Sequence, residues 1–195
     1  MPGMTQWPDA GSVRVRWLVL VVAVMVGLTA GWPLLNTVVA NRQAVAAGPQ
    51  SIGSGPANSG HVKVGHGWTL APAQSNPRLE MSMSRGPVTM SAAFVRLPAG
   101  WHAGQLWAGL GSTLRIRRPG ARLGAARVTT NVQGLTGLVG SLVQGDLSGT
   151  ATIFPAPSRR FAVVMLLLAP RHTRLVDLAG AHKLIRSIQF ARASP

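Results

Sequence analysis

An uncharged apolar run near the start of the chain is its longest hydrophobic feature, and it extends from Trp17 to Ala40. As a helix it would be about 36 Å long at about 1.5 Å per residue, enough to cross a hydrocarbon core about 30 Å thick. Arg14 and Arg16 precede the run, and only Arg42 follows it closely. By the positive-inside bias, this pattern predicts a transmembrane signal-anchor helix with a cytoplasmic N-terminus and an extracytoplasmic C-terminal part.

The same run admits a second interpretation, because Pro33 lies inside it. Proline lacks the backbone N–H and kinks or ends a helix. A shorter apolar stretch, 17–30, followed by a helix breaker and then by Val38-Val39-Ala40, with small residues at the cut site, is also typical of a cleaved secretory signal. We favour the uncleaved anchor, with a cytoplasmic lead over residues 1–16, because the apolar character continues past the proline. Under either interpretation the remainder of the chain is exported to the outside of the cell membrane, as a single-pass protein or as a secreted domain.

Residues 41–60 are rich in Gly, Pro, Ser, Ala and Asn and have almost no large apolar side chain. Such a composition is typical of a flexible linker. We therefore expect a tether over this stretch and one extracytoplasmic domain over residues 61–195.

From His61 onward, apolar and polar positions alternate with a period of two, which predicts half-buried strands. Three strands are expected, over residues 62–70, 78–84 and 87–97. The first would bury Val62, Val64, Trp68 and Leu70 on one side. A helix over residues 101–114 follows, in which Leu106, Trp107, Leu110 and Leu114 recur at spacings of three and four.

The second half of the chain predicts four further strands and a closing helix. The strands are expected over residues 126–132, 135–143, 150–154 and 161–168, as an antiparallel meander. The last of them is apolar on both faces and should be central in the sheet. The helix, 173–189, would place Leu175, Leu178, Ile185 and Ile188 on the sheet, with Asp177 in its first turn.

This order of strands, helix, strands and helix predicts an α+β fold, an antiparallel sheet with two packed helices. Gly67-Trp68 after the first strand, the long meander and the ending Lys183 to Phe190 resemble the PsbP-like fold of LpqN-type exported proteins of actinobacteria. The whole chain also resembles an actinobacterial single-pass protein. The resemblance implies an exported binding or accessory domain more often than an enzyme, and it offers no catalytic motif for these residues.

Composition narrows the possible chemistry. The chain has no cysteine, which excludes disulfides, thiolate metal sites and a cysteine nucleophile. Its formal net charge is +15, with Lys+Arg 19 and Asp+Glu 4, which favours anionic partners. A GC-rich coding sequence would produce the same excess of arginine whatever the function. Export makes nucleic acid an unexpected partner, and the lack of tyrosine leaves little for base stacking.

No catalytic motif accompanies this charge. The carboxylates after the linker, Glu80, Asp146 and Asp177, fall on a strand, a hairpin turn and a helix start, so a catalytic pair is not expected. No two histidines share the i, i+4 spacing of a zinc-protease helix, although His61 and His66 could meet on a strand or turn. Glycines at every third position, Gly134, Gly137 and Gly140, indicate bulges or close backbone approach more than a phosphate loop. We expect no cofactor, no metal and no enzymatic activity.

One positive cluster remains, formed by Arg115, Arg117, Arg118 and Arg122. It is either a solvated loop after a helix or a docking patch for an anionic surface. The sequence therefore predicts a membrane-anchored binding or accessory module that docks on anionic lipid, cell-wall polymer or a membrane protein. The alternative is an exported enzyme with an unrecognised active site.

Overall fold

The computed structural model of the chain describes residues 44–45, 47–55, 58–71, 75–76 and 78–190. The expected cytoplasmic lead and membrane anchor lie outside these residues. Within them, no helix is both long and apolar enough to span a bilayer. The strands are β1 (Ala44–Val45), β2 (Gly48–Gly53), β3 (Ser59–Val64), β4 (Thr69–Leu70), β5 (Glu80–Arg85), β6 (Val88–Arg96), β7 (Ala121–Leu123), β8 (Arg127–Thr130), β9 (Thr136–Gln144), β10 (Leu147–Pro155), β11 (Phe161–Pro170) and β12 (Gln189–Phe190). The helices are α2 (Ala103–Arg117) and α3 (Leu175–Arg186).

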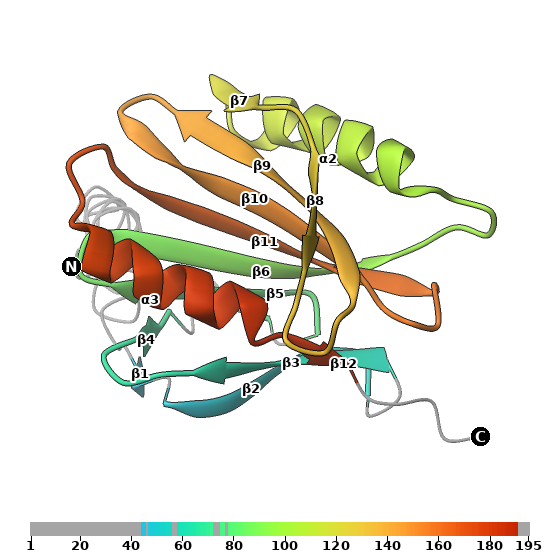
Figure 1. Ribbon diagram of the computed structural model, residues 1–195, viewed down its shortest axis with the longest axis horizontal. Coiled ribbons are helices and arrows are strands. Elements are labelled where there is room, and N and C mark those ends of the chain that lie inside the picture. Colours follow the sequence, from blue (N-terminus) through green and yellow to red (C-terminus); the bar gives the residue numbers. More distant parts are fainter. Residues whose placement is uncertain (1–43, 46, 56–57, 72–74, 77, 191–195) are drawn as a thin grey trace, which may run out of the picture. The chain divides into compact units, whose positions relative to one another are not determined.

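Most strands form one antiparallel sheet, in the order β1-β4-β5-β6-β11-β10-β9-β7, and β8 also pairs with β9 (Figure 1). A second antiparallel sheet has the order β12-β3-β2. Strand β11 lies between β6 and β10 and pairs with both over most of its length. The expected α+β class, with antiparallel sheets and two helices, is confirmed, and so is the central position of the FAVVMLLL segment.

The two helices pack on opposite faces of the main sheet. Along β11, Val163 and Met165 pack against α3 and the small sheet in one core. This core also contains Trp68 and Ile185. The alternate residues of β11 face α2, where Leu114 is buried. Because successive side chains of a strand point to opposite faces, a strand covered on both sides must be apolar throughout.

The expected flexible linker over residues 41–60 is corrected by the structure, because part of it belongs to the folded domain. Strand β2 pairs with β3 over its whole length, from Gly48 to Gly53. Ile52 is fully buried in the main core. A single large apolar residue among small ones gives little periodic signal, and the strand is held by long-range pairing rather than by local preference.

The first expected strand, 62–70, is two strands. β3 belongs to the small sheet and β4 to the main sheet, and a turn at His66 and Gly67 separates them. Gly67 has a φ of +81°, a backbone conformation that favours glycine. Val62, in β3, and Trp68, just before β4, are both buried in the same core.

The closing helix is shorter than expected at both ends. It begins at Leu175 and ends at Arg186, and Gln189 pairs with His61 in the small sheet. Ile188 is buried as expected, whereas the side chain of Leu175 is 83% exposed and does not face the sheet. The helical spacing alone could not show that Leu175 precedes the part of the helix that is covered by the sheet.

Candidate functional site

A cavity of about 560 Å³ lies between α2 and the main sheet. Helix α2 packs over β10 and β11, where Ile153, Val164 and Leu166 form the contact. The neighbouring strands β5 and β6 continue the sheet beyond the helix, so their α2-facing side chains are covered from one side only. The cavity is therefore the space left where a narrow helix covers a wider sheet.

Small side chains keep this space open. On β6, Ser91 and Ala93 line the cavity, whereas Met90 and Ala92 point to the opposite core. On α2, Gly109 lines the cavity, and a Cβ atom added there would meet no other atom within 4 Å. The remaining wall is mostly apolar, with Leu106 and Leu110 among its residues.

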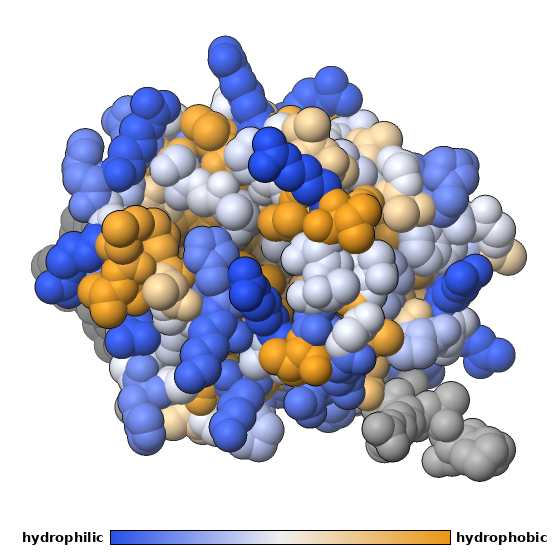
Figure 2. Space-filling model, viewed as in Figure 1, coloured by the Kyte–Doolittle hydropathy of each residue, from blue (hydrophilic) through white to orange (hydrophobic). Residues whose placement is uncertain are grey.

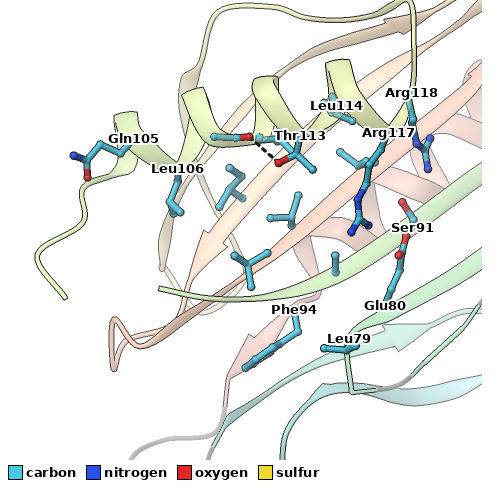
Figure 3. A pocket seen from close by; sticks show the side chains of 17 residues that line it. Leu79, Glu80, Ser91, Phe94, Gln105, Leu106, Thr113, Leu114, Arg117 and Arg118 are labelled. Carbon is cyan, nitrogen blue, oxygen red and sulfur yellow. Dashed lines mark hydrogen bonds between the residues drawn. The ribbon is translucent and has the colours of Figure 1, made fainter. Parts of the chain in front are cut away.

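The charged groups of the cavity gather at one end (Figure 3). Arg117 points from the last turn of α2 toward Glu80 and Ser91, and Arg118 lies beside it. Gln105 and Leu106 lie at the other end. Among the described residues, Arg174 and Asp177 form the one ion pair within 4 Å, so Glu80 and Arg117 line the same end without contacting each other that closely.

The structure divides the four arginines that the sequence placed in one cluster. Arg117 and Arg118 line the cavity just described. Arg115 and Arg122 line a second hollow, of about 590 Å³, on the other side of α2 against β7. The four arginines are near one another in sequence, but a helix places residues two apart, such as Arg115 and Arg117, on different sides. The cluster thus provides two pairs of cations with different neighbours.

The structure also shows the surroundings of the carboxylates and histidines that the sequence analysis considered. Glu80, Asp146 and Asp177 lie on β5, in the β9–β10 turn and in the first turn of α3, as expected. Within the described part of the chain, no three His, Asp or Glu residues come close enough to hold a metal ion. The His61 ring nitrogen Nε2 lies 3.1 Å from the hydroxyl of Ser59, and His66 is exposed in the β3–β4 turn.

The sequence did not indicate the cavity between α2 and the main sheet, which we call the groove, because no motif marks it. The sequence features that could have indicated the groove are small residues: Ser91 and Ala93, on the face of β6 opposite Met90, and Gly109 inside a helix. Glycine in a helix interior costs about 1 kcal/mol relative to alanine, so its presence asks for a packing or functional reason. Only the position of α2 over the sheet shows that Ser91, Ala93 and Gly109 line the same cavity.

Comparison with known proteins leaves the family open. No protein-family model and no curated protein sequence matches the chain. Among solved structures, the Ran-binding protein Mog1p of Saccharomyces cerevisiae is similar with a TM-score of 0.49 and 8% identity, over 75% of this chain and 97% of that one. A mutant of Mog1 has a TM-score of 0.49 and 9% identity, over 73% and 96% of the two chains. A protein from Bacteroides thetaiotaomicron has a TM-score of 0.38 and 9% identity, over 69% of this chain and 46% of that one. Similarities at this level carry no conclusion about ligand or partner.

Proposed function

We propose that the domain is a binding module that holds an elongated apolar molecule with an anionic head in the groove beneath α2. The observation that carries the proposal is the cavity of about 560 Å³, apolar along most of its length and cationic at one end. Ligand sites typically measure about 300–1,000 Å³ and combine apolar walls with a few polar groups that fix orientation.

The length of the groove favours a chain-like ligand. Its α2 wall extends from Gln105 to Arg117, about 18 Å at about 1.5 Å per residue. That length suits the extended chain of a long-chain fatty acid or a single-chain lipid. Arg117 and Arg118 contribute two guanidinium groups to the charged end of the groove, and Glu80 contributes one carboxylate, so this end has a net positive charge and favours an anionic head group.

An enzyme in this groove is the weaker candidate. Of the described residues that line it, Glu80 is the one carboxylate, and no histidine is among them. General acid–base catalysis usually needs a positioned pair of such groups. The lining therefore supports binding more than turnover.

The cellular setting is part of the proposal. The apolar run from Trp17 to Ala40 supports a single-pass anchor in the cell membrane, with the domain outside the cytoplasm. The alternative of a cleaved signal and a secreted domain uses the same run. We also retain the PsbP-like resemblance as the finer description of the fold, with an accessory role for an actinobacterial envelope protein.

Binding of a fluorescent long-chain fatty acid tests the groove. Exchanging Arg117 for Gln should weaken binding by about tenfold or more, since a hydrogen bond to a charged group contributes about 1.5–3 kcal/mol. The matched control is Arg115→Gln, because Arg115 lies in the same last turn of α2 but lines the other hollow. Equal loss in both variants, or equally tight binding of the uncharged fatty alcohol, would contradict the assignment.

Blocking the groove gives a second readout in the same experiment. Gly109→Leu places a side chain in the open space above β6, and the exchange should favour the helix by about 1 kcal/mol. We expect loss of fatty-acid binding in a protein at least as stable as the original. Unchanged binding would show that the ligand lies elsewhere.

A further inference from the structure

The end of α2 and the start of α3 lie at the same end of the main sheet. Leu147, just after the β9–β10 turn, pairs with Pro170 at the end of β11, four residues before the N-cap of α3. Ala121, just after α2, pairs with Gln144 on the other side of that turn. Figure 1 shows this end on the left, with the two helices on opposite faces of the sheet.

Large apolar side chains stand exposed at this end. Leu175 is 83% exposed, Ile116 is 81% exposed and Val176 is 65% exposed. Figure 2 shows an apolar patch over the start of α3, with hydrophilic residues around it. Exposed single apolar residues are common, but these come from two elements, on opposite faces of the sheet, and lie at the same end of the domain. We call Ile116, Leu175, Val176 and the exposed arginines Arg115, Arg122 and Arg171 the docking end.

The charge of the docking end is positive. Two carboxylates lie near it, Asp146 in the β9–β10 turn and Asp177 in α3. The Asp177 carboxylate is paired with Arg174, with 3.2 Å between Oδ2 and Nε, and its side chain is only 15% exposed. Arg115, Arg122 and Arg171 therefore outnumber the single exposed carboxylate of Asp146.

We propose that the docking end seats the domain on an anionic lipid bilayer. Apolar side chains that enter the boundary between head groups and acyl chains, together with cations at the head groups, are the two components of interfacial binding. The cations extend across the strands from β11 to β7, about 14 Å at about 4.8 Å per strand. A bilayer suits this spread, because mobile anionic head groups can reach all of them at once.

This docking does not depend on the ligand of the groove, but the two sites are at one end. Arg117 and Arg118, at the polar end of the groove, lie at the same end of α2 as Ile116. A docked domain would therefore bring the cationic end of its groove near the bilayer. An amphiphile could then pass between the membrane and the groove with its head group near the arginines throughout.

The absence of cysteine allows a site-specific test with the full chain. We would introduce Leu175→Cys or Ile116→Cys, attach an environment-sensitive fluorophore and reconstitute each protein in vesicles with or without phosphatidylglycerol. The matched control is Ser158→Cys, in the β10–β11 turn beside Arg159 and Arg160 at the opposite end of the sheet. All three positions are exposed, so labelling should leave the core intact.

The expected result is a blue-shifted, brighter emission at 175 and 116 in anionic vesicles only, quenched by nitroxide-labelled lipid, with no change at 158. Adding Arg171→Gln should lower the docked fraction roughly fivefold at limiting anionic lipid, the equivalent of one basic residue. A label at 175 that stays in water, or an equal response at 158, would overturn the proposal. Fatty-acid binding by the groove would be unaffected by that failure, so the two proposals are tested separately.

Discussion

Two glycines of β9 show how single residues allow neighbouring groups to pack closely against the strand. A Cβ atom at position 140 would lie 2.5 Å from Cζ2 of Trp107 and 2.8 Å from the carbonyl oxygen of Ala125. A Cβ atom at position 137 would lie equally close to the Phe154 ring, on the strand beside it. The predicted close backbone approach at these positions is confirmed. The third glycine of the series, Gly134, lies in a turn with a φ of +76°.

Two single exchanges should have opposite effects on stability. Gly140→Ala should lower the free energy of unfolding by about 1–3 kcal/mol, because Trp107 or the backbone must move to admit the methyl group. Gly109→Ala in the open groove should raise it by about 1 kcal/mol, through helix propensity. Denaturant unfolding of both variants measures the difference. A stable Gly140→Ala protein would mean that Trp107 is not packed against β9.

At the scale of elements, strand β2 shows that the folded domain includes residues before the expected boundary at residue 61. It pairs with β3 from Gly48↔Val64 to Gly53↔Ser59. Strand β3 in turn pairs with β12, the last strand of the described chain. The small sheet thus joins residues near both ends of the described chain. Strand β1 also pairs with β4, through Ala44↔Leu70 and Val45↔Thr69.

The contribution of β2 can be measured at its buried residue. Ile52→Ala should destabilise the domain by about 2–5 kcal/mol, the usual cost of emptying a fully buried position. Ser51→Ala, at the neighbouring exposed position, should change stability by less than about 0.5 kcal/mol. Thermal or urea unfolding of the two variants is the measurement. If Ile52→Ala behaved like the control, the segment would be a tether, as its composition first suggested.

At the scale of the whole molecule, charge is poorly compensated. The chain carries Lys+Arg 19 against Asp+Glu 4, and the described residues contain a single ion pair, Arg174 with Asp177. Like charges at this density repel one another in the compact state and weaken it. The folded domain must therefore rely for its stability on the apolar residues packed on both faces of the main sheet.

Added sodium chloride should accordingly stabilise the domain. Screening shortens the range of repulsion from about 30 Å at 0.01 M to about 10 Å at 0.1 M ionic strength. We expect a gain of roughly 1 kcal/mol, or about 2–4 °C in Tm for a domain of this size. Scanning calorimetry at the two salt concentrations tests this. A falling Tm would indicate that favourable ion pairs outweigh the repulsion.

The amino-acid sequence alone determined the class of the fold and the approximate places of its strands and helices. Period-two alternation located β5 and β6, and spacings of three and four located α2. The apolar segment from Phe161 to Leu168 indicated a central strand, and β11 is central. These features could be predicted because they depend on periodicities within one segment.

Only the tertiary structure decided what the candidate site is. The sequence identified four arginines, but the placement of α2 divided them between two hollows. It also joined Ser91 of β6 to Gly109 of α2 as walls of one groove, and brought Ile116 and Leu175 to one end of the sheet. Such relations depend on which strands pair and how far a helix covers them. Those outcomes are set by long-range packing, which leaves no local periodic pattern in the chain.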